Sequence, residues 1–523
     1  MKRSTYIWSL LVGCVAFATS CDLTENVQVK ADKSMIFGSK SGLELYSNSF
    51  YKALPTLKNG FMQDKMCDVG AVSNTDTFIK QGAYNTETAT SWSWGALKNV
   101  NYFIDGCNDP KYCTVEAETR DNYLGIARWF RAWFYYDKLT TYGEVPWFPN
   151  DIQSYQNDVM YKDRDSRDVI IRNLIADLDF AYEHIQATSS TGSATLTRWA
   201  AAALKSRVCL FEAAYRRYHN LTGLEITPEE LYREAAKAAK LVIDNSGCSL
   251  NTAAGKKGAY RDLFYSETPL TQEVILAVCA NEKSGIFGEQ NWWFNARSYG
   301  LCWSLVRSFV HTYLKQDGTP FTAAADYAVK SFAEEMEGRD LRLEQTVRGR
   351  NFLWDGKTAV ADIKNLSLTG YQVIKYTLDE SKYDGGAKNI NSIPLIRYAE
   401  VLLNYAEAQA ELGVITDSEW ALTVGALRKR AGITGGTETL PTTVDSYLQR
   451  TFYPDVTSPV LLEIRRERAI ELVAEGMRFD DLRRWKCGSL METLRWSGIH
   501  IPGLEQPVDV NGDGVNDYYF TEG

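Results

Sequence analysis

Several long stretches of the chain carry apolar residues at helical spacing. Between residues 120 and 142 the apolar positions lie three and four residues apart, which places them on one face of an amphipathic helix. These positions are Tyr123, Ile126, Ala127, Phe130, Trp133 and Phe134. The same pattern predicts helices from Ser166 to Ala181, from about Thr197 to Tyr218, after Thr227-Pro228, from Pro394 to Gly413 and from about Val460 to Glu475. The chain is therefore predicted to be mostly α-helical.

The helical pattern breaks up in the middle of the chain. Glycines, single aromatics and short apolar runs replace it, and we interpret residues 251–392 as long loops, short strands and a few helices. Paired amphipathic helices of this length are typical of an α-solenoid of tetratricopeptide-like helix pairs, although no clean self-repeat of about 34 residues is visible. The predicted domain covers residues 34–523, with a helical frame over about 34–250 and 393–487, an irregular ligand-binding part over about 251–392, and a tail over 488–523.

The N-terminal residues have the pattern of an exported, lipid-anchored protein. A cationic start precedes an apolar stretch over residues 6–18, which is too short to span a membrane. Cys21 directly follows small residues and resembles the cysteine of a bacterial lipobox. The pattern predicts removal of residues 1–20, lipidation of Cys21 and a polar tether over 21–33, so that the protein is anchored to a membrane without crossing it. Lipidation at Cys14, or an ordinary signal peptide, is the alternative.

Composition and charge exclude several classes of function. Of the 523 residues, 45% are hydrophobic and 24% are charged, which excludes wholesale disorder. The formal net charge of −9 leaves no overall basic field, so we expect no nucleic-acid partner. The chain contains none of the motifs HExxH, GxSxG, Walker P-loop or strand-linked GxGxxG, and no Cys/His metal spacing. We therefore expect a protein that is not an enzyme, although long-range assembly could still bring two catalytic carboxylates together.

Tyr and Trp together number 44, against 21 Phe, and two clusters of them suit a sugar ligand. A flat ring with a polar tip fits the C–H face of a sugar, and neighbouring amides and arginines fit its hydroxyls. The first cluster lies in a Thr/Ser/Asn-rich stretch, and the second lies in a glycine-bounded loop over residues 287–299. The candidate ligand-binding residues are Tyr84, Trp92, Asn291, Trp292, Trp293, Arg297 and Tyr299. The alternative for each Trp is a packed ring, which the helical spacing after Trp94 favours at that position.

The C-terminal tail contains an acidic, glycine-rich segment similar to a calcium-binding loop. Oxygen-bearing residues stand at relative positions 1, 3, 5 and 9, with a glycine at position 6, as in EF-hand or dockerin-type loops. The candidate ligands are Asp509, Asn511, Asp513 and Asp517. Phe520 takes the place of the usual Glu at position 12, so the alternative is a simple acidic turn. We expect no cofactor other than this structural calcium.

Four stretches, in this order, resemble the signatures of SusD/RagB proteins, which are outer-membrane nutrient-uptake lipoproteins of Bacteroidetes. They are 127–136 followed by Gly143 and Val145-Pro146, 200–211, 394–413 and 467–485. The segment 428–432 also fits a turn of this family. With the lipobox, the resemblance extends over nearly the whole chain.

The resemblance implies a fold of four tetratricopeptide-like units with an irregular binding face. It further implies capture of glycan at the cell surface, without cleavage, and delivery to a SusC-like TonB-dependent transporter in the outer membrane. Three alternatives remain: a surface glycoside hydrolase, a scaffold that holds other proteins, and the same fold capturing peptide or another nutrient. The signature residues would be mainly structural. Glu467, Glu471 and Glu475 repeat at i+4 beside several arginines, and this spacing predicts ion pairs between adjacent turns.

Overall fold

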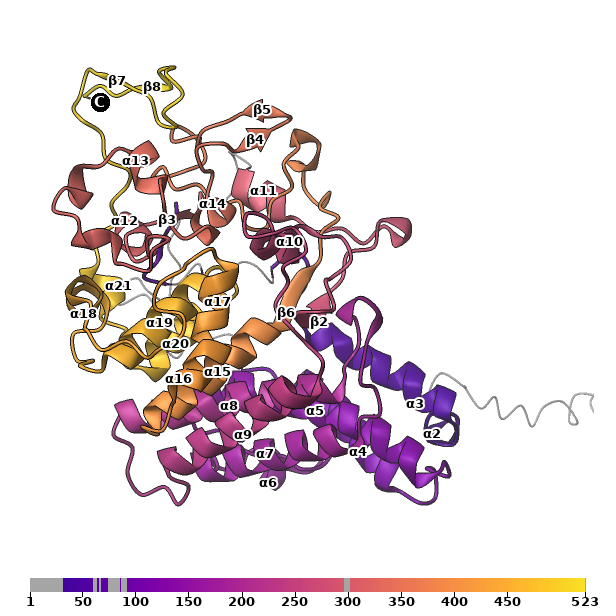
Figure 1. The fold of residues 1–523 in the computed structure, drawn as a ribbon. Coiled ribbons are helices and arrows are strands. Elements are labelled where there is room, and N and C mark those ends of the chain that lie inside the picture. Colours follow the sequence, from indigo (N-terminus) through magenta and orange to yellow (C-terminus); the bar gives the residue numbers. More distant parts are fainter. Residues whose placement is uncertain are drawn as a thin grey trace, which may run out of the picture.

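The computed structural model describes residues 32–59, 64, 67–73, 85, 92–295 and 302–522. Long helices of the first half pack one against the next in chain order, in the lower half of Figure 1. These are α4 (Gly95–Asn108), α5 (Ala117–Tyr142), α7 (Arg167–His184), α8 (Arg198–Tyr218) and α9 (Pro228–Asn245). Three of them begin at a hydroxyl side chain that accepts a hydrogen bond from the first turn, on Ser166, Thr197 and Thr227.

The C-terminal helices return to this first group. Helix α15 (Tyr398–Glu411) packs on α8, on α9 and on α19 (Pro459–Glu471), and α20 (Arg478–Arg484) packs on α8. Helix α8 is buried along almost its whole length, and its alanine-rich start permits this close approach. The core is thus centred on α8, between the two helical groups that Figure 1 shows in magenta and orange.

The rest of the described chain forms short elements, most of them in the irregular part. The other helices are α2 (Lys33–Phe37), α3 (Lys40–Ser47), α6 (Asn157–Met160), α10 (Ala259–Tyr265), α11 (Gln290–Asn295), α12 (Arg307–Val310), α13 (Phe332–Met336), α14 (Arg342–Thr346), α16 (Asp417–Leu422), α17 (Val424–Arg430), α18 (Ser446–Phe452) and α21 (Leu490–Thr493). The 3₁₀ helices are η1 (Asn48–Ala53), η4 (Thr191–Ser193), η5 (Glu282–Ser284), η6 (Phe321–Ala323), η7 (Tyr327–Val329) and η8 (Ser381–Tyr383).

The strands pair into two-stranded antiparallel sheets. The pairs are β1 (Gly70–Ala71) with β3 (Ser304–Leu305), β2 (Val274–Val278) with β6 (Ile393–Arg397), β4 (Leu353–Trp354) with β5 (Lys357–Thr358), and β7 (Pro507–Val508) with β8 (Tyr518–Tyr519). The mostly helical class with a loop-rich insertion and a few short strands is confirmed. The assignment of the helix pairs to tetratricopeptide-type units, and the residue boundaries of the predicted parts, stay predictions.

Two local predictions are wrong. The helix predicted from Pro394 begins only at Tyr398, because residues 393–397 pair with β2 as strand β6. The predicted ion pairs between turns of one helix are not made by Glu467 or Glu471. Both carboxylates are buried, and each pairs with arginines from other segments of the chain.

Candidate functional site

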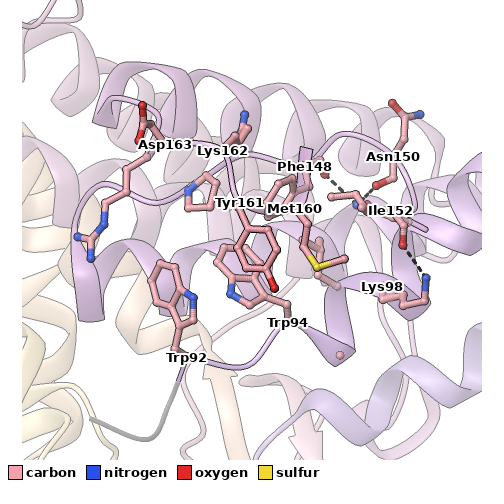
Figure 2. Close-up of a pocket in the computed structure, with 15 residues that line it drawn as sticks. Trp92, Trp94, Lys98, Phe148, Asn150, Ile152, Met160, Tyr161, Lys162 and Asp163 are labelled. Carbon is pink, nitrogen blue, oxygen red and sulfur yellow. Dashed lines mark hydrogen bonds between the residues drawn. The ribbon is translucent and has the colours of Figure 1, made fainter. Parts of the chain in front are cut away.

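A hollow of about 650 Å³ opens between the start of α4 and the loop that joins α5 to α7 (Figure 2). The loop is closed at its base by an antiparallel bridge between Val145 and Asp165, and it carries α6. The hollow is lined by Trp92, Trp94, Gly95, Leu97, Lys98, Asn101, Pro146, Phe148, Asn150, Ile152, Met160, Tyr161, Lys162, Asp163 and Arg164. Aromatic and aliphatic side chains thus form most of its wall, with charged groups at its edge.

Polar side chains of α4 hold the loop in place. The amide of Asn101 donates hydrogen bonds to the carbonyl oxygens of Phe148 and Asn150, at 2.8 and 3.0 Å. The carboxylate of Asp105 accepts hydrogen bonds from the Asn150 side chain and from the backbone N–H of Asp151, both at 2.8 Å. Because these contacts join residues that are 45 to 49 positions apart, the wall of the hollow is fixed by the fold rather than by local sequence.

Trp92 is an exposed ring of the site, and Trp94 supports it. The Trp94 ring meets Phe148 edge to face at 5.2 Å between centroids and also packs against Phe134. Trp92 in turn meets Trp94 at 5.2 Å and Tyr142 at 4.9 Å, both edge to face, and 42% of its surface stays exposed. The arrangement holds Trp92 in one orientation while leaving part of its ring free to stack on a ligand.

The loop contributes two exposed apolar residues that sequence reasoning missed. Met160 is 37% exposed and Tyr161 is 79% exposed, and Figure 2 shows both reaching towards the tryptophans from the α6 side. The sequence does contain a signal for this part of the site, because Tyr155 and Tyr161 are aromatic residues without helical spacing in a polar stretch. Phe148 and Ile152 carried no such signal, because only the fold brings them to the hollow.

Of the other predicted ligand-binding residues, the three that the structure describes, Asn291, Trp292 and Trp293, do not line this hollow. Tyr84, Arg297 and Tyr299, like Cys21, lie outside the described residues. Trp292 and Trp293 are half-buried in α11, which lies in the upper part of Figure 1, away from α6.

Asn291 has a structural position in the interior. It is wholly buried, and its side-chain amide makes four hydrogen bonds. Its Nδ2 donates to the Leu378 carbonyl at 2.8 Å and to the Asp384 carboxylate at 3.1 Å. Its Oδ1 accepts from the Leu378 N–H and from the Asn389 amide, both at 2.7 Å. A side chain occupied in this way is not presented to a ligand.

The acidic loop of the tail is closed by its own hydrogen bonds. The Asp509 carboxylate accepts from the backbone N–H groups of Gly512 and Gly514, at 2.7 and 2.8 Å, and the Asp517 carboxylate accepts from that of Val510 at 2.7 Å. Within the described residues, no group of three or more His, Cys, Asp or Glu side chains is arranged to hold a metal ion. Calcium binding by Asp509, Asn511, Asp513 and Asp517 stays a prediction, which a rise in Tm with Ca²⁺ but not Mg²⁺ would test.

Two further observations concern the described part of the chain. Its cysteines, including Cys107 and Cys113, form no disulfide bonds. None of its helices combines the length and the apolar character needed to span a membrane.

Comparison with known proteins gives one family and a set of similar folds. Residues 272–520 match the model of the SusD family. A SusD-like carbohydrate binding protein from Bacteroides fragilis is 20% identical, with a TM-score of 0.68 over 87% of this chain and 88% of that one. A second SusD-like protein from the same species is 23% identical, with a TM-score of 0.65 over 88% of each chain. A SusD homolog from Bacteroides thetaiotaomicron is 17% identical, with a TM-score of 0.60 over 89% of this chain and 91% of that one. No curated protein matches the chain.

Proposed function

The chain belongs to the SusD family through residues 272–520, and from this premise we propose that it captures glycan in the hollow beside Trp92. One observation carries the proposal. The indole of Trp92 is half-exposed and packs against the rings of Trp94 and Tyr142, in an apolar hollow with a polar edge. Sugars bind well to such a surface because the ring covers their C–H face while polar groups take their hydroxyls. The description of one similar structure as a carbohydrate binding protein supports the same ligand class.

The proposed role is capture without cleavage. A glycosidase normally needs two carboxyl groups facing the scissile bond, about 5 to 10 Å apart. Among the described residues that line the hollow, Asp163 is the single carboxylate, and Figure 2 shows it directed away from Trp92. This geometry favours a binding protein over a surface glycoside hydrolase.

The proposed location and partner of the protein are supported by the N-terminal sequence and by the resemblance to the SusD family. A lipid on Cys21 would anchor the protein in the outer membrane at the cell surface. There it would pass glycan to a SusC-like TonB-dependent transporter. The affinity should be modest, roughly micromolar to millimolar, because a few stacking rings contribute only ~0.5–1.5 kcal/mol each beyond burial. Modest affinity suits capture followed by release to a partner.

Calorimetry with a matched pair of tryptophan variants tests the proposal. A polysaccharide array would first identify a ligand for the lipid-free protein. We expect Trp92→Ala to weaken its binding by roughly tenfold, since the variant removes both stacking and buried area. Trp496→Ala is the control, because Trp496 is exposed to a similar degree, 47%, but does not line the hollow. Equal affinities for the two variants would contradict the proposed site, and release of reducing sugar by the wild-type protein would contradict the proposed role.

The remaining alternatives have different outcomes in the same experiments. A protein that captures peptide or another nutrient would bind no polysaccharide on the array. A scaffold for other proteins would retain its partner whether or not sugar is added.

A further inference from the structure

The described residues at the edge of the hollow include three cations, and two of them are neutralised by carboxylates of the protein. The Lys98 ammonium lies 2.7 Å from the Asp151 carboxylate, and the Lys162 ammonium lies 2.6 Å from that of Asp165. The Asp165 carboxylate also accepts a hydrogen bond from the backbone N–H of Trp147 at 2.6 Å. These charges hold the loop together and leave little attraction for a ligand.

Arg164 differs from both lysines. Its guanidinium carbon lies 5.5 Å from the centroid of the Trp92 ring, and its side chain is exposed. No carboxylate of the described residues forms an ion pair with it. The neighbouring acid, Asp163, is directed away from Trp92 in Figure 2. Within the described residues, the Arg164 guanidinium therefore has no ion-pair partner and lies over the exposed Trp92 ring.

We propose that the glycan bound at Trp92 is acidic, and that Arg164 receives the anionic group of the sugar stacked on that ring. The inference rests on the proposed glycan binding and specifies its ligand. A guanidinium presents a planar fork of N–H donors that matches a carboxylate or a sulfate with two parallel hydrogen bonds. Because the guanidinium carbon lies only 5.5 Å from the centroid of the Trp92 ring, a sugar that stacks on this ring comes within reach of the fork.

The hollow also strengthens this contact. Its wall is mostly apolar, and charge–charge attraction increases where water is displaced by apolar groups. A neutral sugar would gain only ordinary hydrogen bonds from Arg164, whereas an acidic sugar would gain charge-assisted ones, which are roughly twice as strong. Arg164 would therefore distinguish an acidic from a neutral sugar at the unit that stacks on Trp92.

The experiment compares three probes of matched length by calorimetry: a neutral xylo-oligosaccharide, an oligogalacturonide and a sulfated chondroitin oligosaccharide. We expect the wild-type protein to bind at least one acidic probe about tenfold more tightly than the neutral one. Arg164→Gln should remove this preference and weaken binding of the neutral probe far less than binding of the acidic one, since the neutral probe loses only ordinary hydrogen bonds, which the glutamine amide partly replaces. Arg164→Lys should keep part of the preference, because it retains the charge but loses the fork. The preference should also weaken as NaCl is raised, since the contact is at the surface.

Arg172→Gln is the matched control. Arg172 is also an exposed arginine, but it is paired with Glu225 and does not line the hollow. Its removal changes the net charge by the same amount and should leave all three affinities unchanged. Binding of the oligogalacturonide would show that a carboxylate suffices. Binding of the sulfated chondroitin oligosaccharide alone, which carries uronate carboxylates as well, would indicate that the sulfate is recognised.

The possible failures are distinct. Equal or tighter binding of the neutral probe, or an acidic preference that survives in Arg164→Gln, would overturn the inference and leave glycan capture intact. If both proposals hold, Trp92→Ala should weaken binding of every probe that the wild-type protein binds, whereas Arg164→Gln should act mainly on the acidic probes. Absence of binding to every sugar in the wild-type protein would overturn the proposed function and this inference with it.

Discussion

The Arg397 guanidinium lies 2.7 Å from the Glu471 carboxylate, and both side chains are almost completely buried. Arg397 is the last residue of β6, and Glu471 is the last residue of α19. Glu471 also contacts Arg342, at 2.8 Å, and Arg430. Because Arg342 belongs to the irregular part of the chain, this buried cluster joins that part to helix α19 of the helical frame.

Removing the Glu471 charge should strongly destabilise the fold. Glu471→Gln leaves three buried arginines with less compensation, and breaking a buried pair costs about 3–5 kcal/mol of unfolding free energy. Urea denaturation would measure the loss. Glu225→Gln is the control, because its pair with Arg172 is exposed and such pairs contribute at most ~1 kcal/mol. Similar losses in the two variants would contradict the role given to the buried cluster.

The contribution of Glu471 should depend on pH. Burial alone would raise its pKa, but the charges of Arg430, Arg397 and Arg342 outweigh burial and hold the pKa well below 4.5. A carboxyl group whose pKa is lowered by folding adds stability above its unfolded pKa, and the addition is lost as the pH falls through the folded value. The difference in unfolding free energy between wild type and Glu471→Gln should be constant above about pH 5. It should shrink progressively below that pH.

Asp64 should show the opposite dependence. Burial raises its pKa to about 7, although its carboxyl accepts hydrogen bonds from the backbone N–H groups of Gly476 and Arg478. A raised carboxyl pKa adds stability at low pH that is lost as the pH rises through the folded value. Wild type should therefore lose stability relative to Asp64→Asn between about pH 4 and pH 7. Parallel curves for the two proteins, measured by urea denaturation at each pH, would show that this group does not titrate as expected.

Asn291 and Trp92 should separate stability from binding. Asn291→Ala removes four side-chain hydrogen bonds and leaves buried partners unsatisfied, including the Asn389 amide, so we expect a loss of about 2–5 kcal/mol. Its affinity for glycan, measured at a temperature where the variant is folded, should be unchanged. Trp92→Ala should show the reverse pattern. Weaker glycan binding by folded Asn291→Ala would return this residue to the binding site.

The sequence predicted those features that depend on local periodicity. The helix expected from the spacing between residues 120 and 142 is α5. Trp92 is recognisable in the sequence as an aromatic residue of a Thr/Ser/Asn-rich stretch. Features that depend on distant partners could not be predicted. The apolar residues after Pro394 fit a helix or a strand, and only pairing with β2 decides in favour of a strand.

The acidic repeat of α19 illustrates the same limit. Spacing at i+4 indicates ion pairs along a helix, but the arginines that contact Glu471 come from positions 342, 397 and 430. The hollow is a further case, since Phe148 and Tyr161 reach it through a loop held by Asn101 and Asp105. A single sequence contains no signal for such assembly.

Gly106 of α4 should resist substitution although it lies in a helix. Alanine is normally favoured over glycine in a helix interior by about 1 kcal/mol. A Cβ at position 106, however, would lie 2.0 Å from the ring of Phe37, which is wholly buried between α2 and α4. Because that ring has no room to move, Gly106→Ala should lower the unfolding free energy by roughly 1–3 kcal/mol. Gly95→Ala, in the first turn of the same helix, is the control, since nothing lies within 4 Å of its Cβ position. It should leave stability unchanged or raise it slightly in urea denaturation. A stabilised Gly106→Ala variant would show that α2 does not pack against α4 in solution as it does in the structure.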